Sequence, residues 1–238
     1  ESVSLISASY KLSDSFAFQS RFGAVRSDAV TSGNSVAGLT NATLGGLWGT
    51  SLGGGFRLAA CASLGLPIGA GSGNTPNADM AAAMKSAQLA RAGMDNTMFA
   101  VNDVGIPVGA DLAWIRGRFT AQAEINFIPS FRVQGEKKSP DPNKLNFTSA
   151  LMVGYFVVAD RLSIDAELKN QRYLSNPVAV QKDASQRDNL SVAGGVRAYL
   201  PLSEKVTFRP GVSYGVGVYG AIADNKYQMV QVDFPLSF

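Results

Sequence analysis

The last eleven residues of the chain, 228–238, alternate apolar and polar side chains and finish on an aromatic residue. Successive side chains of an extended strand point to opposite faces, so this pattern predicts one wholly apolar face and one mostly polar face. An apolar face of this length fits a hydrocarbon environment, while the polar face fits an aqueous interior. The apolar positions are Val230, Val232, Phe234, Leu236 and Phe238.

The same alternation recurs along the whole chain and predicts about eleven strands. Short turns and longer polar loops alternate between them. The strands are expected near residues 6–10, 16–23, 44–48, 56–68, 106–114, 119–127, 151–157, 162–168, 190–200, 206–218 and 228–238. The short turns fall at 11–15, 51–55, 115–118, 159–161 and 201–205.

Composition narrows the possible environments. No run of eighteen or so apolar residues exists, so a membrane location would require strands that close into a barrel. A mean hydropathy of +0.06 is compatible with this, because alternation hides lipid-facing residues from an average. The net charge of +3 is small and scattered, which argues against nucleic acid as a partner. A soluble β-sandwich is the competing interpretation, and it would need a second sheet to cover the apolar faces.

With these features the chain resembles the outer-membrane β-barrel proteins of Gram-negative bacteria. The resemblance covers nearly the whole chain and implies an all-β fold, one transmembrane antiparallel barrel domain over residues 1–238, in the bacterial outer membrane. It also implies contact with outer-membrane lipid and lipopolysaccharide. In this class the C-terminal strand, here residues 227–238, is the signal read by the barrel assembly machinery. The alanine- and glycine-rich strands are also similar to barrels of gliding bacteria, including the outer-membrane platform of myxobacterial gliding motility, although no motif marks that platform.

Barrels of this class have short turns on the periplasmic side and long loops outside. This rule orients the first predicted strand toward the periplasm and leaves Glu1 on the outer side. Since single-chain bacterial barrels usually have even strand counts, we expect a strand upstream of Glu1 and about twelve in all. An odd-stranded barrel or a miscounted strand is the alternative.

The longest connection spans residues 69–105 and is expected to act as an extracellular cap or as a constriction. It contains a helix signal over residues 81–92, with Asn77 or Asp79 as the N-cap and Gly93 at the end. Met80, Met84 and Leu89 are the candidate plug residues. The alternative is a surface loop with one short helix.

The polar faces of the strands predict a lumen with nearly balanced charge, which suits ion pairs across a narrow interior. About twelve strands enclose a small space, and a small or plugged lumen is expected. Several glycines also face inward and either leave room for another segment or allow curvature. The charged lumen-lining candidates are Arg21, Arg57, Asp111, Glu124, Asp165, Glu167, Lys169, Arg197, Arg209 and Asp233.

The chain has no histidine, which removes the proton relay on which known barrel enzymes resemble one another. Histidine-ligated metal sites are removed as well, and the single Cys61 does not replace them. Asp165 and Glu167 share a strand face, but Lys169 follows on that face, so structural pairing is favoured over catalysis. No enzyme activity, metal or cofactor is predicted.

Aromatic residues near strand ends predict interfacial girdles. The main candidates are Trp48, Trp114, Phe119 and Phe127.

Two functions fit these features. The first is a structural or docking barrel in a cell-envelope assembly for motility, secretion or adhesion, with other envelope proteins as partners. The second is a porin-like passive diffusion channel for small solutes. Balanced charge and a narrow lumen favour the first. The small outward residues Ala60, Ala62, Ala121 and Ala123 are candidates for a partner contact.

Overall fold

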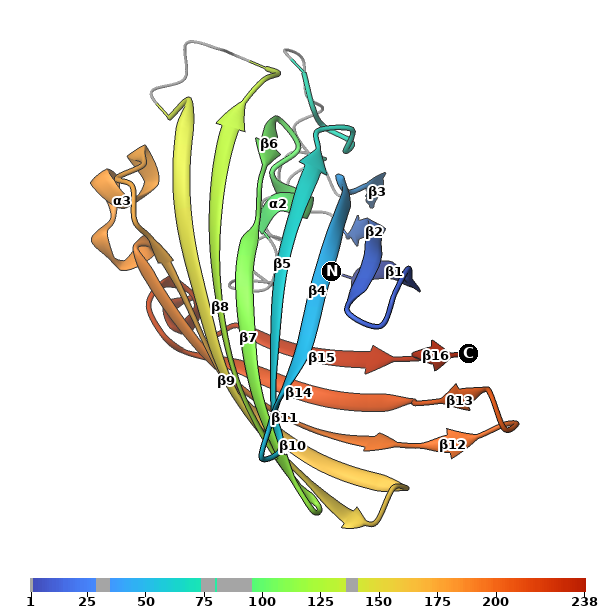
Figure 1. Ribbon diagram of the computed structural model, residues 1–238. Helices are drawn as coiled ribbons and strands as arrows, with labels where there is room; N and C mark the ends of the chain where they lie inside the picture. The colour runs from blue at the N-terminus through green and yellow to red at the C-terminus, as the bar shows by residue number, and fades with distance from the viewer. Residues whose placement is uncertain (1, 29–34, 74–79, 81–95, 136–140) are drawn as a thin grey trace.

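Most of the chain forms one long antiparallel sheet whose strands follow each other in chain order (Figure 1). The computed structural model describes residues 2–28, 35–73, 80, 96–135 and 141–238. Eleven strands make up the main path, in the order β1-β2-β4-β5-β6-β8-β9-β10-β11-β14-β15. Their bounds are β1 Ser2–Lys11, β2 Phe16–Ser27, β4 Ala42–Gly53, β5 Phe56–Leu66, β6 Asp103–Gly105, β8 Phe119–Arg132, β9 Asn143–Val158, β10 Leu162–Tyr173, β11 Asp188–Ala198, β14 Gly211–Tyr219 and β15 Gln228–Asp233.

Two further strands belong to this sheet. β7 (Val108–Arg116) continues the line of β6 after Pro107 and also lies between β5 and β8, so β6 and β7 act as one interrupted strand. β3 (Val36–Leu39) pairs with residues 24–27 at the end of β2. The connection between the strands expected near residues 16–23 and 44–48 therefore contains a short strand that was not predicted. The all-β antiparallel architecture expected from the alternation is confirmed.

The sheet curls until strands that are not neighbours face each other. A cavity is lined by Gln19 and Arg21 of β2 and also by Lys169 of β10, although six steps of the strand order separate β2 from β10. Figure 1 shows the same strong curvature. The sheet thus has a concave face around a hollow and a convex face outside.

Side chains of opposite character lie on the two faces because the alternation in the sequence matches the period of a strand. On β10, Leu162, Ile164 and Leu168 are exposed on the convex face, while Asp165 and Glu167 on the concave face are half-buried. The convex face carries most of the exposed large apolar side chains.

Connections of different length lie at opposite ends of the strands. The β4–β5 and β7–β8 turns are very short and use Gly54, Gly55 and Gly117 in left-handed conformations that favour glycine. The other end carries the long connections, in which the described residues form the short helical segments α2 Asn96–Phe99, α3 Val178–Lys182, η1 Ala184–Gln186 and α4 Ala221–Asp224. None of the helices in the described part of the chain is long and apolar enough to cross a membrane.

The last three strands are interrupted near the short-turn end. Beyond the breaks lies a small sheet of β12 (Leu200–Pro201), β13 (Thr207–Phe208) and β16 (Leu236–Ser237), called the flange below. Proline has no backbone N–H to donate, and Pro210 and Pro235 lie at the breaks. The prediction of one continuous terminal strand over residues 228–238 is therefore wrong at Phe234 and Pro235, although the in-and-out alternation of exposure continues to Leu236.

The strands β1 and β15 stand at the two ends of the strand order. Within the described residues, no strand pairs with the outer edge of either one. Every neighbouring pair along the path is antiparallel, so the first and the eleventh strand run in the same direction. Antiparallel pairing of β1 directly with β15 is thus excluded by their directions.

Candidate functional site

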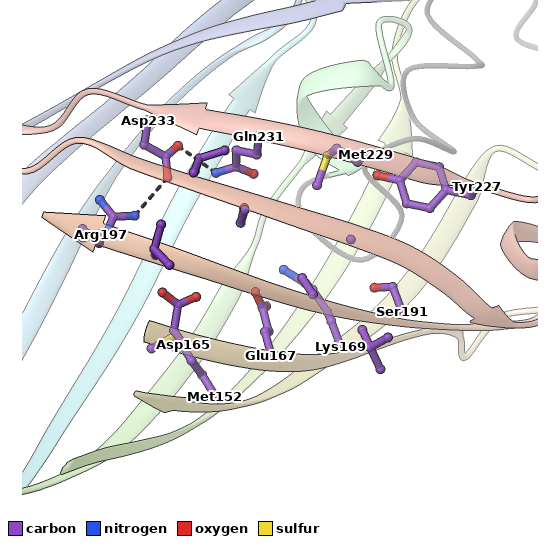
Figure 2. Close-up of a pocket in the computed structure, with 16 residues that line it drawn as sticks. Met152, Asp165, Glu167, Lys169, Ser191, Arg197, Tyr227, Met229, Gln231 and Asp233 are labelled. Carbon is purple, nitrogen blue, oxygen red and sulfur yellow. Dashed lines mark hydrogen bonds and ion pairs between the residues drawn. The ribbon is translucent and has the colours of Figure 1, made fainter. Parts of the chain in front are cut away.

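The concave face of the last strands carries a charged cavity of about 190 Å³ (Figure 2). Asp165, Glu167 and Lys169 of β10 line it because every second residue of a strand shares a face. Arg197 of β11 and Asp233 of β15 complete it, with Arg197 Nη2 2.9 Å from Asp233 Oδ2. This ion pair joins β11 to the edge strand β15 across β14.

Small residues around this cavity leave the space for the charged side chains. Asp165 lies opposite Gly154 of β9 and Gly195 of β11 in the strand register. A Cβ at Gly195 would lie 2.9 Å from Ser213 Cβ, so a larger residue there would force the strands apart. Gly154 has open space beside it, with its nearest heavy atom at 3.8 Å.

A second cavity of about 230 Å³ lies between β2 and β10 and shares Lys169 with the first. Arg21, Cys61 and Glu124 also line it. The Asn126 amide donates a hydrogen bond to Glu124 and lies near the Cys61 thiol. Since one lysine faces both cavities, they are parts of a single hollow.

A third cavity, of about 640 Å³, lies at the short-turn end. Lys11, Arg57 and Asp111 line it, and Gln122 donates a hydrogen bond of 3.4 Å to Asp111. The hollow is therefore wider at this end than between β2 and β10.

The structure brings together most of the charged residues that the sequence singled out. Nine of them line one of the three cavities: Arg21, Arg57, Asp111, Glu124, Asp165, Glu167, Lys169, Arg197 and Asp233. Arg209 lies apart, between the flange and β14. Its carbonyl accepts a hydrogen bond from Arg197, and its buried Nε has no hydrogen-bond partner in the described structure. Five of the nine cavity-lining residues are acidic and four are basic. Acidic neighbours occur in pairs, with Asp111 opposite Glu124 in the strand register and Asp165 two residues before Glu167 on β10.

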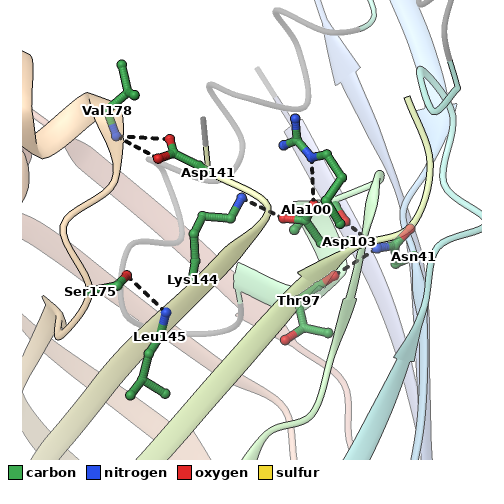
Figure 3. A network of polar contacts seen from close by, with 10 residues as sticks. Asn41, Thr97, Ala100, Asp103, Asp141, Lys144, Leu145, Ser175 and Val178 are labelled. Carbon is green, nitrogen blue, oxygen red and sulfur yellow. Dashed lines mark hydrogen bonds and ion pairs between the residues drawn. The ribbon is translucent and has the colours of Figure 1, made fainter. Parts of the chain in front are cut away.

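The long-loop end of the hollow is filled by the segment that carries α2 (Figure 3). Met98 is completely buried, and it forms an apolar cluster with Val25, Phe99 and Val101. Val3 and Leu5 of β1 pack against this cluster from the sheet wall. Residues 96–105, named the inner plug below, thus occupy the interior at this end.

Asn41 fixes the inner plug to the wall. Its side chain is fully buried, and its Nδ2 donates to the carbonyls of Thr97 (3.0 Å) and Ala100 (2.9 Å). Its Oδ1 accepts a hydrogen bond of 3.0 Å from the backbone N–H of Gly69. Asn41 therefore uses both amide donors and its amide oxygen to hold both ends of the longest connection.

Glycines make room for the inner plug. A Cβ on Gly65 would collide with the Thr97 Cγ2, and a Cβ on Gly105 would lie 2.6 Å from the same atom. The α4 segment is accommodated likewise, because a Cβ on Gly217 would lie 2.7 Å from the Ile222 backbone. The hypothesis that inward glycines admit another segment thus applies at Gly217, with α4 as the neighbour.

A buried carboxylate anchors the far side of the inner plug. Asp103 Oδ1 lies 3.1 Å from Arg132 Nε of β8, and Asp103 Oδ2 lies 2.6 Å from Lys144 Nζ of β9. A single carboxylate at 2% exposure is costly unless paired, and here two cations satisfy it.

Neighbouring loops at this end are tied together in the same way (Figure 3). The Asp141 carboxylate accepts from the backbone N–H of Val178, the first residue of α3. Ser175 Oγ accepts from the N–H of Leu145 at 3.0 Å.

The residues that fill the hollow belong to the connection 69–105, which was expected to form a cap or constriction, but they lie outside the expected helix. The expected helix over residues 81–92, with Met84 and Leu89, lies outside the described residues. Met80 is described and packs against the apolar cluster. Asn41, Thr97 and Asp103 were missed. Asn41 lies just before β4 and Asp103 is the first residue of β6, and neither belongs to a periodic pattern in the sequence.

Aromatic side chains on the convex face lie at two levels. Trp114 contacts Phe56 and Phe119, with ring centroids 6.4 Å and 5.9 Å away. Phe127 pairs with Phe147 at 5.2 Å toward the long-loop end. Phe119 and Phe127 are separated by about 26 Å along β8, from ~3.3 Å per residue. Trp48 is exposed on β4, opposite Phe16.

The terminal residues lie on the convex face. Val230, Val232, Phe234 and Leu236 are all more than half exposed, and Phe238 is 95% exposed.

Comparison with known proteins adds no relative. No family model matches the chain, and no curated protein is significantly similar to it. Within the described residues, no group of three or more His, Cys, Asp or Glu side chains is arranged to hold a metal ion.

Proposed function

We propose that this protein is a plugged transmembrane β-barrel of a bacterial outer membrane and serves as a structural or docking component of a cell-envelope assembly. The observation that carries the proposal is the exposed apolar convex face. It includes Leu151 at 59% and Val230 at 69% exposure, together with exposed residues on every long strand. Soluble monomers rarely expose contiguous apolar patches of more than a few hundred Å².

The barrel would be completed by one strand running antiparallel to both β1 and β15, giving about twelve strands. Such a strand would satisfy both free edges with antiparallel hydrogen bonds. Lipid offers no partner for open backbone groups, so a membrane-embedded sheet of this kind requires closure.

The inner plug favours a scaffold over a channel. Met98, Phe99 and the buried Asn41 fill the long-loop end, and the charges in the hollow are balanced. A selective pore more often concentrates one sign of charge at its constriction. A passive diffusion channel remains the second candidate, and the 640 Å³ cavity at the short-turn end favours it.

The proposed partners are outer-membrane lipid, lipopolysaccharide, the barrel assembly machinery and other envelope proteins. Ala60, Ala62 and Ala123 are exposed small residues on the convex face, while Ala121 is half-buried. These positions would allow close approach of an apolar partner surface. Ala62→Leu with Ala123→Leu should disrupt co-purification of such a partner, and an unchanged assembly would exclude this surface.

Single-channel recording in a planar bilayer separates the two functions. The native protein is expected to be silent. The double variant Asn41→Ala, Asp103→Ala, which loosens the inner plug, is expected to conduct in steps. The matched control Asp188→Ala changes an exposed ion pair at the same end and should stay silent. If the native protein shows steady conductance and passes solutes, the proposed scaffold function is wrong and a diffusion channel is supported instead.

A further inference from the structure

Arginine side chains at the two ends of the sheet differ in whether they have partners, although the short-turn end also holds one ion pair, Lys11–Asp14 at 2.7 Å. At the long-loop end, Arg26, Arg132, Lys144 and Arg172 each form an ion pair with an aspartate. At the short-turn end, Arg116, Arg118 and Arg161 are exposed, and their side chains have no hydrogen-bond or ion-pair partner within the described residues. The short-turn end therefore carries exposed guanidinium groups that have no partner among the described residues.

These three arginines lie on adjacent hairpins. Arg116 is the last residue of β7, and Arg118 belongs to the turn into β8. The Arg118 carbonyl accepts a hydrogen bond of 2.9 Å from Phe156 of β9, which places this turn beside the β9–β10 hairpin. Arg161 lies in that hairpin, next to Asp160. The local balance is three cations to one anion.

The aromatic side chains at the short-turn end of the convex face lie directly beside these three arginines. Arg116 is paired with Phe119 in the strand register. It lies on the same face of β7 as Trp114, two residues earlier. Phe56 and Phe119 are both exposed there. Rings of this kind lie at the depth of lipid headgroups in membrane proteins, so the arginines fall at the depth of the phosphates.

We propose that Arg116, Arg118 and Arg161 bind the phosphate of an anionic phospholipid in the leaflet that surrounds the short-turn end. The inference rests on the proposed membrane insertion. Guanidinium groups bind phosphate oxygens through paired N–H donors, and three on neighbouring hairpins match one headgroup better than a single cation does. A headgroup is favoured over an acidic protein because the arginines lie next to exposed aromatic side chains. A lipid would cover these side chains, whereas a water-soluble partner would leave them exposed.

Tryptophan quenching tests this site. The chain has two tryptophans, so Trp48→Phe leaves Trp114 as the single reporter beside the arginines. The reporter protein is reconstituted in vesicles with brominated phosphatidylglycerol or brominated phosphatidylcholine. Quenching should show phosphatidylglycerol bound at least about fivefold more strongly than phosphatidylcholine, since a single basic residue near a membrane surface contributes roughly a fivefold factor.

Arg116→Gln with Arg118→Gln should reduce this preference to near unity, and Arg161→Gln should reduce it partly. The matched control Arg26→Gln with Arg172→Gln removes two exposed arginines at the other end and should leave the preference unchanged. Equal quenching by both lipids in the reporter protein overturns the phosphate site but leaves membrane insertion standing. Absence of quenching by either lipid overturns insertion itself. If soluble polyglutamate reduces the quenching of Trp114 and neither lipid is preferred, the arginines would instead bind an acidic protein.

Discussion

Lys144 Nζ lies 2.6 Å from the Oδ2 of Asp103, a carboxylate with only 2% exposure. Arg132 lies 3.1 Å from the other carboxylate oxygen, so side chains of β8 and β9 both bind the first residue of β6. The pairing makes the position of the inner plug depend on a charge, as well as on apolar burial.

Asp103→Asn is expected to lower the free energy of unfolding by about 1–3 kcal/mol, because two cations lose a buried partner. Both cations are about one-fifth exposed, which allows water to relieve part of the loss. Urea unfolding of the reconstituted protein measures the change. Asp188→Asn removes a more exposed ion pair with Arg172 and should cost less than about 1 kcal/mol. Equal effects of the two variants would contradict the anchoring role.

Gly65→Ala should destabilise the protein by about 1–3 kcal/mol, since the added methyl group collides with Thr97 of the inner plug. Protease cleavage near α2 should increase in parallel. Gly154→Ala is the control, because open space surrounds that position, and it should stay within about 0.5 kcal/mol of the native protein. If Gly65→Ala leaves the stability unchanged, the inner plug does not pack closely against β5 at this position.

The sheet was largely predictable because its signal is local. Alternation along β8, β10 and β14 reports the two faces directly, and each expected strand has a counterpart in the structure. The interruptions near Pro107 and Pro235 were not predicted, because proline is also tolerated at strand edges and ends.

The inner plug was not predictable from the sequence. Asn41 contacts Thr97 across 56 residues of the chain, and no periodicity links such distant positions. Asp103 likewise pairs with Arg132, 29 residues away. The charged faces were found because they repeat, whereas the contacts that fill the hollow occur once each.

Leu151→Arg and Met152→Arg should have opposite outcomes although they are neighbours on β9. Leu151 is 59% exposed on the convex face, and an arginine there should cost about 2–4 kcal/mol in a membrane. Met152 faces the cavity with Asp165 and Glu167, where an added cation finds carboxylates. Folding into vesicles, followed by heat-dependent gel mobility, measures both. Equal tolerance of the two changes would mean that lipid does not cover the convex face.

Deletion of Phe238 should reduce the amount of assembled protein in cells severalfold while leaving stability within about 0.5 kcal/mol. The side chain is 95% exposed, so it contributes little to the folded state, and under the proposed function it would act through recognition by the assembly machinery. Ser237→Ala is the control. A loss of stability equal to the loss of assembly would instead indicate a packing role.

Backbone amides of β1 and β15 should exchange as slowly as those of β8 and β9 in protein isolated from its native membrane, if a further strand closes the sheet. Hydrogen–deuterium exchange with mass spectrometry measures this protection. Exchange that is fast along both edge strands, with β8 and β9 protected, would show that the sheet stays open.

The proline-bordered flange has a mechanical consequence. Ala198 and Arg209 donate their N–H groups to the carbonyls of Pro210 and Pro235, so the hydrogen bonds at the breaks run one way only. Three adjacent strands are thereby weakened at one level, beside the edge strand β15. We therefore expect this corner of the sheet to bend more easily than the uninterrupted strands, without loss of the pairing in the main sheet.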